Sequence, residues 1–154
     1  MESMNTVATG ENSEHDMQRH NELTASQPYV LIIEDDEAFG RGVSIALQQF
    51  GYPTLVARTV REAEIAMGRY GPMVIRIVIS DIHLTGSREV TEGYILYQQW
   101  IAAYPTLAYL LMSGDEAVTT LPDICTGQVP FLLKPFRFSL LKNIVSVLLN
   151  QDTI

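Results

Sequence analysis

Residues 30–37 read VLIIEDDE, a short apolar run that stops abruptly at four consecutive acids. The run from Tyr29 to Ile33 is too short for a helix and rich in strand-forming residues, so it predicts a β-strand. Residues 38–50 then carry apolar side chains at helical spacing, which predicts a helix. The chain therefore opens its folded part with a strand, an acidic turn and a helix.

The same alternation continues towards the C-terminus. Further strands are expected over residues 54–57, 74–80, 107–112 and 129–133, and further helices over residues 60–70, 92–104 and 138–149. Pro122 interrupts residues 115–127, so the helix there should be short or broken. Five strands that alternate with five helices predict an α/β fold, a three-layer, doubly wound parallel sheet with helices on both faces.

Length and charge bound the organisation of the chain. It has 154 residues and a formal net charge of −8, which fits a single domain. Residues 1–28 hold five acids against one base and few aromatic or β-branched residues, so they are expected to form a disordered acidic tail. Residues 29–150 would then be the folded domain and 151–154 a short C-terminal tail, with no room for a separate effector domain.

Composition also excludes several classes of function. An acidic chain without a run of Lys or Arg is a poor nucleic-acid binder, and no apolar run approaches the roughly 18 residues that a membrane span needs. The N-terminus lacks the pattern of a secretory signal, so a cytoplasmic protein is expected. The single cysteine, Cys125, cannot form an internal disulfide, and it is expected to be a small, partly buried residue.

Chemically informative side chains follow four of the expected strands. They are Glu34 and Asp35, Asp81, Ser113, and Lys134. Ligands of an open parallel sheet bind at the carboxyl ends of its strands, so these side chains should become neighbours. Carboxylates gathered at one edge favour a bound cation, and an all-oxygen ligand set suits Mg²⁺. Together with an amine and a hydroxyl, they fit phosphoryl transfer with an aspartate as acceptor.

Four motifs, in this order, resemble the receiver domain of two-component response regulators. They are VLIIEDDE at 30–37, VISD at 78–81, LLMSG at 110–114 and FLLKPF at 131–136. The similarity runs from about Tyr29 to Leu149. It implies a flavodoxin-like sheet with strand order 2-1-3-4-5. It also implies a stand-alone signalling domain, similar to chemotaxis regulators, rather than an enzyme.

The resemblance assigns the phosphoacceptor and the metal site. Asp81 matches the aspartate that accepts a phosphoryl group from a histidine kinase or a phosphotransfer protein. Glu34, Asp35 and Asp81, with the main-chain carbonyl of His83, match the ligands of Mg²⁺. The His83 side chain itself is expected to be solvated. Asp36, which also belongs to the acidic run, is interpreted as the N-cap of the following helix.

The resemblance also assigns the groups that respond to phosphorylation. Ser113 and Lys134 match the hydroxyl and the amine that contact the phosphoryl group, and Phe131 occupies the aromatic switch position. Pro135 follows the lysine, in the family often through a cis bond. Two plainer interpretations stay open: Ser113 as a turn residue and Phe131 as core packing. The output would be contact with a downstream protein, without direct binding to nucleic acid or membrane.

The sequence departs from the family in two places. Thr85 stands where a proline is common after Asp81, and Gly93 comes about four residues late, so residues 85–92 (TGSREVTE) are an expected insertion. This insertion is either a tolerated surface loop or one that alters kinase access or the lifetime of the phosphoryl group. The broken helix over 115–127 weakens the usual dimer surface, so a monomer or weak dimer is expected.

Three alternatives to an active, stand-alone receiver remain. The first is a pseudo-receiver that is not phosphorylated and acts as a binding module. The second is a receiver fragment of a longer DNA-binding regulator. The third is a small phosphotransferase or hydrolase with an aspartate nucleophile, although His83 occupies the place where a dehalogenase-type phosphatase has a second aspartate.

Overall fold

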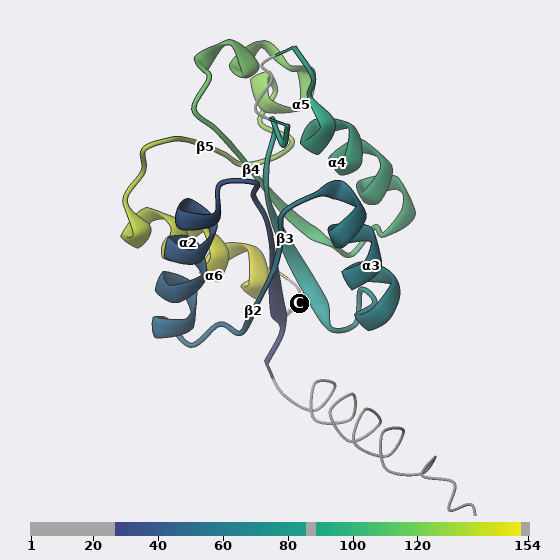
Figure 1. Cartoon of the computed structure of the whole chain (residues 1–154), viewed down its shortest axis with the longest axis vertical. Coiled ribbons are helices and arrows are strands. Elements are labelled where there is room, and N and C mark those ends of the chain that lie inside the picture. Colours follow the sequence, from purple (N-terminus) through teal and green to yellow (C-terminus); the bar gives the residue numbers. More distant parts are fainter. Residues whose placement is uncertain (1–26, 86–88, 152–154) are drawn as a thin grey trace, which may run out of the picture.

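Five parallel strands form the centre of the molecule (Figure 1). The computed structural model describes residues 27–85 and 89–151. The expected acidic tail and C-terminal tail lie almost entirely outside these described residues, as does the middle of the expected insertion. The strands are β1 (Tyr29–Ile33), β2 (Thr54–Ala57), β3 (Ile75–Asp81), β4 (Ala108–Ser113) and β5 (Phe131–Leu133). Their order is β2-β1-β3-β4-β5, so the predicted topology is confirmed.

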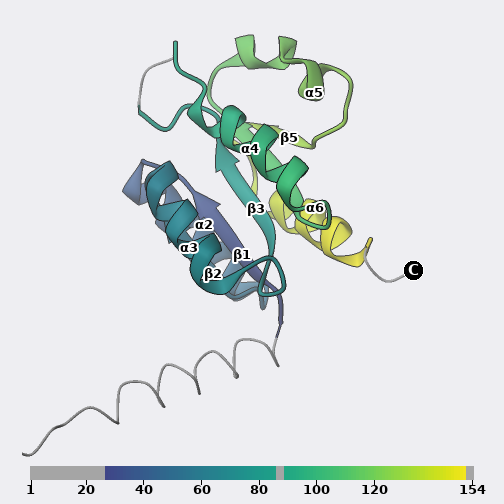
Figure 2. The same cartoon turned by 90° about the vertical axis from the view of Figure 1, so that its right-hand side faces the viewer.

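Helices cover both faces of the sheet (Figures 1 and 2). They are α2 (Glu37–Gln49), α3 (Val60–Tyr70), α4 (Glu92–Ala103), α5 (Pro122–Cys125), α6 (Phe138–Asn150) and the 3₁₀ helix η1 (Glu116–Thr120). Helices α2 and α6 lie on one face, and α3 and α4 lie on the other. The predicted three-layer, doubly wound arrangement is therefore confirmed.

Two hydrophobic cores flank the sheet, because successive strand residues point to opposite faces. Leu31, Ile33 and Leu111 belong to the core under α3 and α4, whereas Ile32 and Leu110 belong to the core under α2 and α6. All five side chains are fully buried. Such burial on both faces explains the nearly continuous apolar runs of the central strands.

Local capping fixes where the helices begin. The Asp36 carboxylate accepts a hydrogen bond from the backbone N–H of Phe39 at 3.0 Å, which confirms Asp36 as the N-cap of α2. At α3, the Thr59 hydroxyl accepts from the N–H of Glu62 at 3.1 Å. The carboxylate of Glu62 accepts in turn from the N–H of Arg58 at 2.7 Å. Side chains thus satisfy N–H groups that the first helical turn leaves unpaired.

The segment between β4 and β5 is broken, as Pro122 predicts. It forms η1 and then α5, a single turn of four residues with Pro122 in its first position. No α5 residue is buried, and Cys125 is exposed. The expectation that Cys125 is partly buried is therefore wrong, because so short a helix leaves its last residue on the surface.

None of the helices in the described part of the chain combines the length and apolarity that crossing a bilayer requires.

Candidate functional site

The polar residues singled out in the sequence meet at one edge of the sheet. Glu34 and Asp35 follow β1, Asp81 ends β3, Ser113 ends β4 and Lys134 follows β5. The strands are parallel, so their carboxyl ends share that edge. Residues separated by up to a hundred positions in the chain therefore become neighbours, as expected.

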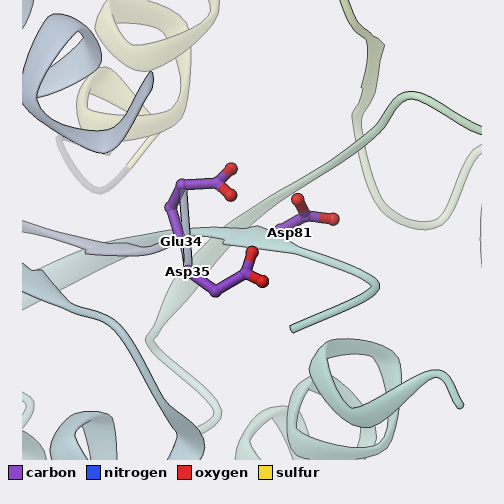
Figure 3. Close-up of side chains that lie close together, drawn as sticks. All are labelled: Glu34, Asp35 and Asp81. Atoms are coloured by element: carbon purple, nitrogen blue, oxygen red, sulfur yellow. The ribbon is translucent and has the colours of Figure 1, made fainter. Parts of the chain in front are cut away.

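An acidic cluster forms the base of this site (Figure 3). Glu34, Asp35 and Asp81 each offer a carboxylate oxygen, and these atoms all lie within 4.8 Å of one another. Glu34 and Asp81 are only 1% and 6% exposed, whereas Asp35 is half-buried. Three carboxylates at this distance repel one another, which favours a cation between them.

Lys134 supplies one internal cation. Its Nζ donates to Oε2 of Glu34 at 2.5 Å and to Oδ2 of Asp81 at 2.6 Å. The same nitrogen lies 4.3 Å from the ring centroid of Phe39, a cation–π contact. The peptide bond to Pro135 is cis, and the N–H of Lys134 donates to the carbonyl of Ser113 at 2.8 Å.

The pKa values of Glu34 and Lys134 both differ from their ordinary values. Desolvation is the largest influence on Glu34, and although Lys134 opposes it, the pKa of Glu34 rises from 4.5 to about 7. Desolvation also lowers the pKa of Lys134, but its hydrogen bonds and charge attraction to Asp81 and Glu34 outweigh this, so its pKa is raised overall. The lysine therefore stays charged, whereas the carboxyl group of Glu34 is easier to protonate than an ordinary glutamate.

The second oxygen of Asp81 is held by the backbone. Its Oδ1 accepts from the N–H of His83 at 3.0 Å. Because Lys134 contacts Oδ2, both carboxylate oxygens of Asp81 have hydrogen-bond partners. Their positions are therefore fixed by β3, by the turn after it and by β5.

Ser113 lies at the site, and its hydroxyl forms its hydrogen bond with the backbone after β4 rather than with Asp81. It is 1% exposed, and its Oγ accepts from the N–H of Asp115 at 3.0 Å. Phe131 is half-buried and packs against the core under α4. Ser113 thus forms a turn hydrogen bond and Phe131 packs in the core, as the plainer interpretations expect. Their roles as switch residues stay predictions.

Sequence reasoning missed two contributions to the site. Phe39, in the first turn of α2, covers Lys134 and also makes an edge contact with Phe136, with ring centroids 5.7 Å apart. The available signal was an aromatic residue two positions after the acidic run. The His83 side chain was expected to be solvated, but it is only 11% exposed.

Gly93 fixes the close approach of α4 to the phosphoacceptor position. Its N–H donates to the carbonyl of Ile82 at 3.0 Å. A Cβ at Gly93 would lie 1.8 Å from the carbonyl oxygen of Asp81, a distance that no side chain tolerates. The glycine that the sequence comparison placed about four residues late is therefore required by packing against the end of β3.

The donor set fits Mg²⁺. It consists of carboxylate oxygens, which are hard ligands, and Asp35 is open enough to solvent for the ion to keep bound water. The neighbouring like charges give the protein a reason to bind a cation there. Glu34 and Asp81 would each have to share their oxygens between that ion and Lys134.

Comparisons with known proteins agree with this architecture. No family model matches the chain. It is 26% identical over 125 residues to the two-component response regulator EHD1 of rice (Oryza sativa subsp. indica), which covers 81% of this chain. The chain spans about a third or less of the length of the curated relatives it matches.

Solved structures give the same result for the fold. A response regulator receiver domain protein from Clostridium thermocellum superposes with a TM-score of 0.71 at 16% identity, covering 82% of this chain and 97% of its own. The receiver domain of NtrX from Brucella abortus gives a TM-score of 0.67 at 25% identity, covering 79% and 98%. The chain therefore has the fold of response regulator receiver domains, and the curated proteins that it resembles are two-component response regulators.

Proposed function

We propose that this chain accepts a phosphoryl group on Asp81 and thereby switches a protein-interaction surface. The observation that supports the proposal most directly is the environment of Asp81. Its carboxylate is buried, lies in the acidic cluster and has each oxygen positioned by a separate hydrogen bond. We take residues 29–150 as the receiver unit, with a histidine kinase or phosphotransfer protein as donor and a cytoplasmic protein as target.

Asp81 would act as the nucleophile. One of its carboxylate oxygens forms the new bond to phosphorus while the bond from phosphorus to the donor nitrogen breaks, and that nitrogen keeps the electron pair. The product on the protein is an acyl phosphate. No proton has to leave Asp81, because the carboxylate is already the attacking form.

Lys134 would stabilise the charge that this transfer brings in. Its ammonium already lies 2.6 Å from Asp81 Oδ2, so an oxygen of an incoming phosphoryl group would come within its reach. The Phe39 ring and the buried partners restrict where the ammonium can move. In this proposal Ser113 turns its hydroxyl to the same group, and Phe131 responds to the vacated space.

Glu34, Asp35, Asp81 and the main-chain carbonyl of His83 would hold Mg²⁺. When bound, the ion neutralises the carboxylates and the phosphoryl oxygens that approach them. The pKa of Glu34 would then fall, because a nearby cation favours the carboxylate form.

Chemical labelling tests the proposal. The protein is incubated with Mg²⁺ and acetyl phosphate, and intact mass reports a phosphoryl adduct that is stable in acid and removed by hydroxylamine. We expect the adduct in the native chain, its absence in Asp81→Asn, and its persistence in Glu116→Gln, an exposed acid of η1. A native chain that stays unlabelled would identify a binding module instead, and an Asp81→Asn chain that is labelled equally would show that Asp81 is not the acceptor.

A further inference from the structure

The His83 side chain lies between two loops that are separate in sequence. Its Nδ1 is 3.1 Å from the carbonyl oxygen of Val90, which precedes α4. Its Nε2 is 3.8 Å from Oδ2 of Asp115, which precedes η1. Since a carbonyl oxygen only accepts, Nδ1 carries the hydrogen of the first contact. Nε2 is buried and has no hydrogen-bond partner among the described residues.

Asp115 continues this connection towards Ser113. Its backbone N–H donates to Ser113 Oγ at 3.0 Å, and its Oδ1 accepts from the N–H of Ala117 at 3.0 Å, which caps η1. Asp115 therefore holds the Ser113 hydroxyl on one side and faces His83 on the other. The backbone N–H of His83 donates to Asp81, so the chain of contacts begins at the proposed phosphoacceptor.

We propose that the His83 imidazole couples the position of Ser113 to the backbone at Val90, so that the state of Asp81 is read just before α4. His83 is a positioning residue in this proposal. The inference rests on the proposed function for its trigger, because phosphorylation of Asp81 is what would move Ser113.

Ser113 and Val90 are coupled because Asp115 contacts Ser113 and also faces His83, which in turn contacts Val90. If Ser113 Oγ turns towards a phosphoryl group on Asp81, it leaves the N–H of Asp115, and the Asp115 loop shifts. The carboxylate of Asp115 then moves relative to the His83 ring, and the ring's hydrogen bond to Val90 has to adjust. Val90 is 42% exposed and apolar, so a shift there changes an apolar element on the surface.

The first measurement needs no phosphorylation. Amide hydrogen exchange is followed at residues 93–95, where the N–H groups of Gly93 and Ile95 are hydrogen-bonded at the start of α4, and at residues 115–117. The proteins compared are the native chain, His83→Phe, Asp115→Ser and the double variant. Phe keeps the bulk of the ring and removes its nitrogens, and Ser keeps a short capping oxygen for η1 but cannot reach His83. Glu116→Ser is the matched control, because Glu116 is the neighbouring exposed acid.

We expect each single change to speed exchange in both segments by roughly three- to tenfold, equivalent to losing about one net hydrogen bond. The double variant should exchange no faster than the faster single variant, since both changes remove the same connection. Fully additive effects, a response in only one segment, or an equal response in Glu116→Ser would overturn the proposal. Exchange in β1 and β3 should stay unchanged, which separates this effect from general unfolding.

The second measurement adds Mg²⁺ and acetyl phosphate and scores the adduct by intact mass. In labelled native protein, exchange at residues 93–95 should change. In His83→Phe brought to the same labelled fraction, whatever incubation that takes, this change should be lost while the change at 115–117 remains. Label without a change at residues 93–95 would overturn the coupling and leave the proposed function intact. No label would overturn the proposed function, and the first measurement alone would then decide whether His83 connects the loops.

Discussion

Lys134 is held on three sides, by Glu34, by Asp81 and by the ring of Phe39. An ammonium has three donors, so two carboxylates and one aromatic face leave little for water to satisfy. Lys134 therefore stabilises the unphosphorylated protein, in addition to its proposed contact with a phosphoryl group.

Replacing Lys134 with Met should destabilise the metal-free protein and abolish labelling. Breaking a buried pair costs roughly 3–5 kcal/mol, and we expect the lower end because Lys134 is partly exposed. Mg²⁺ should raise the melting temperature of Lys134→Met more than that of the native chain, since the ion replaces the lost charge. Thermal unfolding with and without Mg²⁺ measures this, with Lys142→Met, an exposed lysine of α6, as control. An equal metal effect in all three proteins would contradict it.

Glu34 should make the stability of the metal-free protein depend on pH. Burial is the main reason that its pKa is about 7 in the folded state, against 4.5 ordinarily. Between these two pH values the folded protein binds more protons than the unfolded chain does. The contribution of Glu34 to the free energy of unfolding is therefore complete below pH 4.5 and is lost as the pH rises to about 7. The loss is at most roughly 3–4 kcal/mol, because the pKa rises from 4.5 to about 7 and each pKa unit is worth about 1.4 kcal/mol. Urea unfolding between pH 4.5 and 8 should show this slope in the native chain and in Glu37→Gln, but not in Glu34→Gln.

The start of α4 lies directly against the end of β3. Gly93 lies against the backbone of Asp81, so the position of α4 and that of the phosphoacceptor depend on each other. The helix thus reaches the site through a main-chain contact as well as through the loop that precedes it.

Gly93→Ala should shift α4 away from β3 and destabilise the protein by about 3 kcal/mol, the upper end of the usual cost of overpacking. Gly68→Ala is the matched control, because a Cβ there meets nothing within 4 Å. Within α3 that change should stabilise by about 0.5–1 kcal/mol. Urea unfolding measures the free energy of unfolding of both variants. Similar values for the two would show that α4 does not need a glycine next to the backbone of Asp81.

At the scale of the whole molecule, two cores share one sheet. Leu110 and Leu111 are fully buried on opposite faces of β4. Truncating either to Ala should cost about 2–5 kcal/mol. Because both cores need the same strands, each variant should unfold in a single transition. Fluorescence of Trp100, the only tryptophan of the chain, and far-ultraviolet circular dichroism should then give one midpoint. Separate midpoints would show that the cores unfold independently.

The sequence was most informative about the sheet and its polar edge. Apolar runs that end in Glu34, Asp81 and Lys134 predict both the strands and the meeting of these side chains, because parallel strands share an edge. Contacts made by single side chains were harder to predict from the sequence. The covered ring of His83 depends on where Val90 and Asp115 come to rest, which periodicity does not describe. Cys125 was misjudged because general preferences for burial say nothing of a one-turn helix.

The acidic cluster and its lysine also determine which ions suit the site. Glu34, Asp35 and Asp81 bring three negative charges when ionised, and Lys134 brings one positive charge, so a divalent ion restores electroneutrality. Without the lysine, the excess is that of a trivalent ion. Lys134→Met should therefore favour lanthanides over Mg²⁺ more strongly than the native chain does. Competition between terbium and Mg²⁺, followed by terbium luminescence, would read the charge balance of the pocket directly.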